Sequence, residues 1–255
     1  MSARGRGGNF ERRMATADGL AMLVLMVVLV AAGVSGLAVL GEVFVIPAFI
    51  MTLVVVFIGA GLFMLQPNEA AVLTLFGDYV GTCREPGLRW TFAWNMRRKV
   101  SVRTRNHNVD QLKVNDRRGN PIEIAAVVVW RVEDTAQALF DVEDFEQFVR
   151  VQCESALRHV ATHYDYDEGA DHADGEVTLR GGAETVAQAL REEVQLRVQQ
   201  AGVKVEEAKL THLAYAPEIA GAMLRRQQAE AVISARAMIV RGAVEMVEMA
   251  LASLS

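Results

Sequence analysis

The chain opens with a long apolar block and then changes to patterned segments. Between Gly19 and Leu65, 37 of 47 residues are apolar, and Glu42 is the only charged residue. Each half of this block is uncharged and would form a helix about 34 Å long, enough to cross a hydrocarbon layer of about 30 Å. The pattern therefore predicts a two-helix membrane hairpin over residues 19–65. We expect Glu42 at the far interface, since a carboxylate at mid-bilayer is costly.

After this block the apolar residues follow strand periodicity. Leu88, Trp90, Phe92 and Trp94 alternate with smaller or more polar residues, which is typical of a strand. Turn-forming residues separate the apolar runs. We expect a largely antiparallel sheet, with strands over residues 70–76, 80–84, 88–94, 97–105, 109–114 and 122–132.

The second half of the chain combines helical segments with one more strand. The spacing of apolar residues predicts helices over 135–163 and 184–201, a strand over 203–213, and a last helix that Pro217 opens and that continues to Ser255. An acidic loop connects the first two helices. Strands followed by packed helices predict an α+β domain over 66–216, with a separate helix over 217–255.

The distribution of charge indicates an orientation and excludes some functions. Residues 1–18 carry four Arg against two acidic residues, and we interpret them as a basic cytoplasmic tail under the positive-inside rule. Two crossings, or a wedge in one leaflet, both return the following domain to the cytoplasmic side. Residues 66–255 carry 22 basic and 28 acidic groups, so the domain is a poor general nucleic-acid binder. Two cysteines cannot build a disulfide framework or a cysteine-rich zinc site.

Several short stretches resemble one family. Together, in order along the chain, they resemble the SPFH (Band 7) family of stomatins, prohibitins and flotillins, and the later ones resemble its bacterial members. The stretches are residues 85–88 (EPGL), 138–143 (ALFDVE), 152–158 (QCESALR), 214–220 (AYAPEIA) and 223–231 (MLRRQQAEA).

This resemblance implies a non-enzymatic scaffold without a cofactor, in a bacterial cytoplasmic (inner) membrane, with its SPFH domain on the cytoplasmic side. Its partners would be membrane lipids, further copies of itself in a large homo-oligomer that organises a membrane microdomain, and a membrane protease or channel as client. The alternative is a regulatory subunit of a membrane protease or channel in a small complex of fixed stoichiometry. Family members usually continue past the point at which this chain stops, so we expect a truncated chain or a short variant.

A basic and aromatic segment is the candidate for contact with the membrane surface. From residue 84 to residue 105 there are seven basic residues and one acid. Trp favours the headgroup level, and Lys and Arg attract anionic lipid. The alternative is a core strand beside a solvated basic face. The predicted contact residues are Leu88, Arg89, Trp90, Phe92, Trp94, Arg97, Arg98 and Lys99.

The last helix is the candidate for self-assembly. Its apolar residues recur every three or four positions, and a lone helix of this kind does not stay exposed in water. We expect it to pack on neighbouring copies; the alternative is packing on its own domain. The predicted contact residues are Val232, Ala235, Ile239, Ala243, Met246 and Ala250.

The other residue patterns lack the spacing or the residue types that a catalytic, metal-binding or phosphate-binding site requires. His159 and His163 are four residues apart, but no glutamate follows the first one and no third ligand is evident. The acidic residues that begin at Asp165 do not match the spacing of a calcium loop, so we expect a solvated acidic loop. Cys83 is either acylated or an ordinary buried thiol, and we favour the buried thiol. The glycines of residues 5–8 follow no strand, which argues against a phosphate-binding turn.

Overall fold

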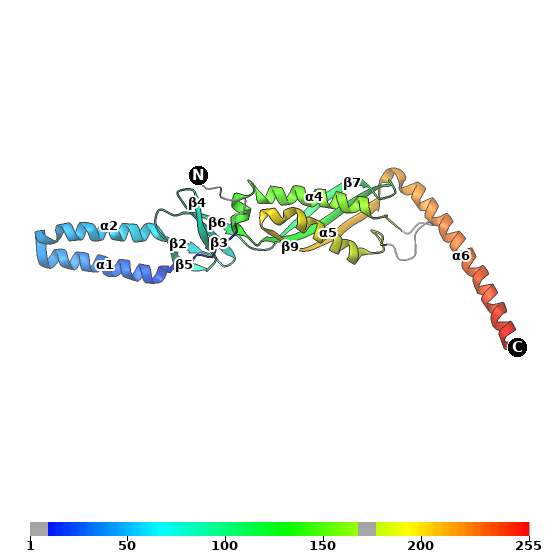
Figure 1. Ribbon diagram of the computed structural model, residues 1–255, viewed down its shortest axis with the longest axis horizontal. Coiled ribbons are helices and arrows are strands. Elements are labelled where there is room, and N and C mark those ends of the chain that lie inside the picture. The colour runs from blue at the N-terminus through cyan, green and yellow to red at the C-terminus, as the bar shows by residue number, and fades with distance from the viewer. Residues whose placement is uncertain (1–9, 168–176, 255) are drawn as a thin grey trace, which may run out of the picture. The chain divides into compact units, whose positions relative to one another are not determined.

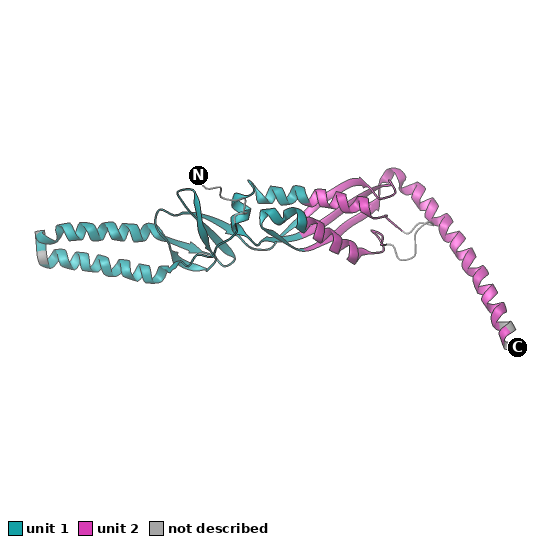
Figure 2. Cartoon of the chain, viewed as in Figure 1, with its two compact units in different colours: residues 1–107, 129–152, 195–206 teal, residues 108–128, 153–194, 207–255 magenta. Residues whose placement is uncertain are grey.

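The computed structural model describes residues 10–167 and 177–254 (Figure 1). The chain divides into two compact units, which Figure 2 colours separately. Unit 1 comprises residues 1–107, 129–152 and 195–206, and unit 2 comprises residues 108–128, 153–194 and 207–255. Among the described residues, two helices and the three longest strands contribute residues to both units.

A helical hairpin forms the first part of unit 1. It consists of α1 (Gly19–Leu40), the 3-10 helix η1 (Gly41–Phe44) and α2 (Val45–Gly61), and the two long helices lie side by side (Figure 1). The Asp18 side chain caps α1 by accepting a hydrogen bond from the backbone N–H of Leu20, at 3.1 Å. Gly41 ends α1 with a φ of 56°, a backbone conformation that favours glycine.

The predicted second helix is four residues too long. α2 ends at Gly61, and Leu62–Leu65 form strand β2 instead of a last helical turn. These four residues are apolar, so composition alone did not separate them from the membrane helix. They are drawn into a sheet because β5 (Gly87–Trp90) offers them antiparallel backbone partners. The segment Gly19–Val39 is long and apolar enough to cross a membrane, whereas Val45–Gly61 is shorter.

In the part of the chain that the structure describes, the predicted antiparallel sheet is divided into three sheets of three strands each. The first has the order β1-β5-β2, where β1 is Ala17–Asp18. The second has the order β4-β3-β6, made of β3 (Glu69–Leu75), β4 (Asp78–Cys83) and β6 (Met96–Ser101). The third has the order β7-β8-β9, made of β7 (Arg105–Asn115), β8 (Pro121–Val132) and β9 (Val203–Tyr215).

In the first two sheets every strand pairing is antiparallel. Ala71 of β3 lies opposite Cys83 on one side and Lys99 on the other. β3 is the central strand, and its residues Ala70 to Leu73 have no exposed surface. The prediction of an α+β fold with antiparallel sheets is confirmed.

The predicted helix over 135–163 is two helices. α3 (Thr135–Phe140) and α4 (Phe145–His163) are separated by residues 141–144. The side chain of Asp144 accepts hydrogen bonds from the backbone N–H groups of Glu146 and Gln147, at 2.9 and 3.1 Å, so a new helix begins there. The carboxylate of Asp134 caps α3 in the same way.

The remaining helices agree with the predicted segments. α5 (Ala183–Val198) is followed by the 3-10 helix η2 (Gln199–Ala201), and Gly202, with a φ of 62°, turns the chain into β9. α6 (Pro217–Leu254) is a single helix of 38 residues. α4 and α5 each bury one face at helical spacing: Val149, Cys153, Ala156, Leu157 and Val160 in α4, and Val186, Leu190, Val194 and Val198 in α5.

Candidate membrane-contact and assembly surfaces

Both ends of the hairpin are joined to the same strand of unit 1. β1 precedes α1, β2 follows α2, and Trp90 of β5 lies opposite both Ala17 and Leu62. The approach is close because Gly61 has no side chain: a Cβ there would lie 2.3 Å from the backbone oxygen of Thr91 and 2.3 Å from Nε1 of Trp90. The two ends of the hairpin are therefore fixed beside one another on one sheet.

Four aromatic side chains gather around the base of the hairpin, and we call Phe57, Trp90, Phe92 and Trp94 the aromatic collar. The ring of Phe57 lies 4.8 Å from that of Trp94 and 6.5 Å from that of Trp90, and Trp90 lies 5.4 Å from Phe92. Nε1 of Trp90 donates a hydrogen bond of 2.9 Å to the carbonyl of Ile58 in the last turn of α2. Trp94 and Phe92 remain 60% and 50% exposed.

The collar differs from the single strand predicted over residues 88–94. β5 ends at Trp90, and a tight turn follows. In this turn the backbone N–H of Asn95 donates a hydrogen bond to the carbonyl of Phe92, and the side-chain amide of Asn95 donates one to Oγ1 of Thr91. The alternation of large apolar residues with smaller or more polar ones over residues 88–94 therefore comes from a short strand followed by a turn. The turn is what leaves the rings of Phe92 and Trp94 exposed beside α2.

The predicted basic contact residues have several different partners. The guanidinium of Arg97 donates hydrogen bonds to the carbonyls of Ala60 and Leu62, where α2 ends, and burial lowers its pKa. Nζ of Lys99 donates to the carbonyl of Met64 at 2.8 Å, and Arg89 pairs with Glu85 at 2.7 Å. Arg98 is exposed, and Leu88 packs against Gly19 at the start of α1. Arg97 and Lys99 thus stabilise the hairpin base, whatever further contact the segment makes with lipid.

Residues 10–16 form an N-terminal strap that the sequence did not predict. The N–H of Thr82 donates to the carbonyl of Arg12, and the N–H of Met14 donates to the carbonyl of Thr82, so the strap lies along the free edge of β4. A Cβ on Gly81 would lie 2.8 Å from Cβ of Met14. The strap corrects the interpretation of residues 1–18 as a tail, at least for residues 10–18; Arg4 and Arg6 lie outside the described residues.

The carboxylate of Glu11 holds the strap in place. It accepts hydrogen bonds from Nε and Nη2 of Arg84, at 2.6 and 2.7 Å, and from both N and Oγ1 of Thr135, each at 2.9 Å. Burial acts to raise the pKa of Glu11, but the hydrogen bonds from Arg84 and Thr135 outweigh it, so the pKa is lowered overall. Glu11 therefore links the strap to Arg84, which directly follows β4, and to Thr135 of α3, all within unit 1.

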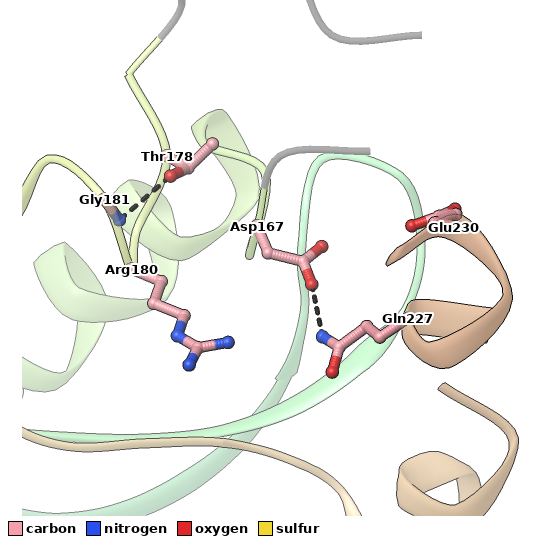
Figure 3. Close-up of a pocket in the computed structure, with 6 residues that line it drawn as sticks. All are labelled: Asp167, Thr178, Arg180, Gly181, Gln227 and Glu230. Carbon is pink, nitrogen blue, oxygen red and sulfur yellow. Dashed lines mark hydrogen bonds between the residues drawn. The ribbon is translucent and has the colours of Figure 1, made fainter. Parts of the chain in front are cut away.

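In unit 2, the start of α6 is fixed by a polar cluster around Asp167 (Figure 3). Its carboxylate accepts hydrogen bonds from the hydroxyl of Tyr215, at 3.0 Å, and from Nε2 of Gln227, at 2.6 Å, and Arg226 lies 3.8 Å away. Burial and the nearby Asp167 raise the pKa of Tyr215. Glu218, in the first turn of α6, pairs with Lys113 of β7. Beside the cluster lies a polar cavity of about 540 Å³, lined by Asp167, Thr178, Arg180, Gly181, Gln227 and Glu230.

Beyond this cluster, α6 exposes its apolar side chains. Among the predicted assembly residues, Val232, Ile239 and Met246 are 51%, 72% and 64% exposed, and Ala235 and Ala243 are also exposed. The side chain of Ala250 lies outside the described residues. Further apolar residues are exposed on the same helix: Ile233, Met238, Val240, Val244, Val247 and Met249. In the described chain, therefore, α6 does not bury these side chains against its own domain.

The interpretation of the acidic loop is corrected at two of its residues, Asp165 and Asp167. Asp165 is 4% exposed and lies 3.2 Å from Nε of Arg118, and Asp167 binds the start of α6 as described above. Asp165 is therefore a buried ion-pair partner, and Asp167 is a partly exposed residue with a structural role. Asp171 and Asp174 lie outside the described residues.

The remaining candidate groups differ in exposure: both histidines are exposed, and both cysteines are buried. The rings of His159 and His163 lie 4.3 Å apart, and Nδ1 of His159 is 3.3 Å from Glu193. Cys83 is 1% exposed and contacts Oγ1 of Thr16, which confirms the favoured interpretation as a buried thiol. Burial raises the pKa of Cys153 to about 12. Within residues 10–167 and 177–254, no three His, Cys, Asp or Glu side chains are placed to share a metal ion. Residues 5–8 lie outside the described residues.

Comparison with known protein families matches residues 63–244 to the SPFH domain / Band 7 family. Members of that family are generally membrane-associated scaffolds, typically without enzymatic activity. A comparison with curated proteins gives no match. The matched range begins within β2 and ends within α6, so it includes β5, on which both ends of the hairpin pair, and most of the exposed helix.

Proposed function

Because the chain belongs to the SPFH domain / Band 7 family, we propose that it is a membrane-anchored scaffold that assembles into large homo-oligomers. In this role it would organise a membrane microdomain and hold or regulate partner membrane proteins, such as a protease or a channel. The observation that carries the proposal is the exposure of apolar side chains along α6. Apolar surface of this extent on a soluble helix marks a contact with other protein or with membrane.

The arrangement of residues around α6 favours neighbours on two sides. With 3.6 residues per turn, Met238 and Met249 lie about 150° around the helix from Val240 and Val244. Most polar residues of this part of the helix occupy one narrow stripe, which contains Ser234, Arg241, Glu245 and Glu248, whereas Arg236 lies outside it. A helix with a single partner needs one apolar stripe, whereas a helix that is apolar on two flanks suits a neighbour on each.

Contacts on two different flanks lead to a particular kind of assembly. If one flank of each copy meets the other flank of the next, the contact is head-to-tail, and it must close into a ring or grow without limit. Burying one side chain such as Ile239 or Met246 contributes about 1.5–3 kcal/mol. Several such side chains in each contact supply the free energy for a stable ring.

The hairpin would anchor each copy by crossing the bilayer completely. α1 has 22 residues, and η1 with α2 has 4 and 17, so each leg is about 33 Å long at the rise of these helices. A wedge in one leaflet would bury only about half of that length in a layer of about 30 Å. The aromatic collar then lies at the near interface, and η1 lies at the far one.

The orientation follows from the distribution of charge. Four Arg precede the first helix, and no Lys or Arg lies between the two helices, so the positive-inside rule places the SPFH domain in the cytoplasm. The resemblance to bacterial family members favours a bacterial cytoplasmic membrane. On that side, the aromatic collar and the basic residues beside it would face the headgroups.

The test is to place charges in the centre of the apolar face of α6. Ile239→Glu, Ala243→Glu and Met246→Glu together add three negative charges. We expect this triple variant to remain membrane-bound but to be extracted in mild detergent as monomers or small species. Single-particle mass photometry measures the change in mass relative to the unmodified protein.

A matched control places the same change in charge on the polar stripe of the same helix. Ser234→Glu adds one negative charge and Arg241→Glu changes the charge by two, which again makes three. This control should keep the particle mass of the unmodified protein. An unchanged mass for the triple variant would refute the assignment of α6 as the assembly helix.

A further inference from the structure

The turn between β3 and β4 holds an aromatic residue in two unfavourable situations at once. Phe76 has a φ of 50°, in the left-handed region, where a bulky residue is an outlier. Its side chain is also 92% exposed, more than any other large apolar side chain in the part of the chain that the structure describes. Both features are unfavourable in water.

A second turn in the same unit provides a comparison. Asn68, between β2 and β3, is the other non-glycine residue with a positive φ, 62°, among the described residues. Asparagine tolerates this conformation well and is common in turns. The same backbone conformation is thus occupied by a suitable polar residue at one end of β3 and by an exposed phenylalanine at the other.

Strand register places Phe76 at the membrane end of the sheet. β3 and β6 are antiparallel, with Glu69 opposite Ser101 at one end and Thr74 opposite Met96 at the other. Met96 directly follows the turn that carries the exposed part of the aromatic collar, and it is itself 70% exposed. The β3–β4 turn therefore emerges from the same end of the sheet as the base of the hairpin, whereas Asn68 lies at the opposite end.

We propose that the ring of Phe76 inserts into the interfacial layer of the bilayer beside the hairpin. This inference rests on the proposed membrane anchorage, because the hairpin is what brings the turn to the lipid surface. Removing the ring from water into the interface would offset the strain of its backbone. Phe76 then provides a second point of contact, beside the hairpin, that fixes the tilt of the β4-β3-β6 sheet on the membrane.

The experiment measures the depth of single labelled positions in the full-length protein. A cysteine is introduced by Phe76→Cys, Trp94→Cys or Asn68→Cys, and each is labelled with an environment-sensitive fluorophore. The native Cys83 and Cys153 are 1% and 0% exposed, so the introduced thiols are the accessible ones. The proteins are reconstituted into vesicles of phosphatidylcholine and phosphatidylglycerol, with and without nitroxide-labelled phosphatidylcholine as a quencher.

We expect lipid-borne quenching and a blue-shifted emission at positions 76 and 94, and neither at position 68. If position 94 is quenched while position 76 behaves like position 68, the insertion of Phe76 is wrong and the anchorage stands. If neither 76 nor 94 is quenched, the proposed membrane contact of the collar is wrong as well. A blue shift at position 76 without quenching by lipid would instead identify a contact with protein and would also overturn the proposal.

A second variant tests whether the ring has a structural role within the fold. Phe76→Asn places a residue that suits the positive φ in the same turn. In detergent we expect its thermal unfolding midpoint to equal or exceed that of the unmodified protein. A clear decrease in the midpoint would show that the ring packs within the protein, and the proposed insertion would then be wrong.

Discussion

The hairpin and α6 both expose apolar side chains, but they differ in the charges among them. α1 carries no charged residue over its 22 positions, and its side chains are exposed along the length that suits a membrane span. α6 carries eight charged residues over its 38 positions, including Glu230, Arg241 and Glu245. Hydrocarbon excludes such charges, whereas a protein interface that leaves a polar stripe in water accommodates them.

The two regions also differ in how they are attached. The hairpin is fixed at both ends, because β1 and β2 flank β5 and Gly61 allows the closest approach. α6 is held over its first three turns, by the hydrogen bond of Gln227 to Asp167 and the ion pair of Glu218 with Lys113. The exposed apolar surface of the hairpin therefore indicates a contact with lipid. For the exposed apolar surface of α6, we propose a contact with further copies of the chain.

The largest expected effect is a difference between the two regions in accessibility to a reagent that cannot cross the membrane. Val43, in η1, is 86% exposed, and Ser234 lies on the polar stripe of α6. If the hairpin crosses completely, Val43→Cys reacts with a membrane-impermeant maleimide in intact cells, whereas Ser234→Cys reacts only after lysis. Protection of both positions until lysis would favour a wedge in one leaflet over a crossing.

A smaller effect is expected from adding one methyl group to a glycine in each region. Gly61→Ala places Cβ against the backbone of Thr91 and the indole of Trp90, and we expect a loss near the upper end of the range of about 1–3 kcal/mol for overpacking. Gly242→Ala in α6 meets nothing within 4 Å and should stabilise the helix by about 0.5–1 kcal/mol.

Thermal unfolding in detergent measures the effect of both glycine substitutions. Equal midpoints for Gly61→Ala and the unmodified protein would mean that the hairpin is not held as closely on β5 as the structure indicates.

The smallest expected effect concerns the strap that precedes the hairpin. Glu11→Gln removes a charge-assisted pair with Arg84, for which we expect a loss of about 1.5 kcal/mol at neutral pH. The pKa of Glu11 is lowered in the folded protein, so its contribution is fully present above the unfolded pKa, near 4.5, and is lost as the pH falls through the folded value.

Unfolding midpoints of the two proteins across pH measure that contribution. The difference between the unmodified protein and Glu11→Gln should therefore be largest at neutral pH and should shrink in acid. A difference that is constant across pH would show that the carboxylate charge is not what stabilises the strap.

The sequence predicted the elements whose patterns are long. The apolar block, the strand over residues 122–132 and the helix that Pro217 opens each extend over ten or more residues, and all three are present. Local patterns were less reliable. Leu62–Leu65 is as apolar as α2, so nothing in its composition distinguishes a strand from a helical turn. The helix break before Phe145 did carry a signal, because Asp144 and Gln147 have the spacing of a capping box.

The contact surfaces were predictable to a smaller extent. The aromatic residues of 88–94 were found because tryptophan is a strong local signal, whereas Phe57 of the collar was hidden within an apolar block. Phe76 was missed because its exposure and backbone conformation depend on the strands that flank it. Glu11 was missed because its partners, Arg84 and Thr135, are distant in the sequence. Interactions between distant residues need the folded structure.

The mass of the full-length protein in mild detergent tests the central claim most directly. The chain has a mass of 27.9 kDa. If copies cover one another's α6 helices, mass photometry should give a narrow population at a large multiple of that mass, after subtraction of the bound detergent. A population at the mass of one chain, or of a small complex with fixed stoichiometry, would contradict the proposed assembly and would favour an accessory subunit.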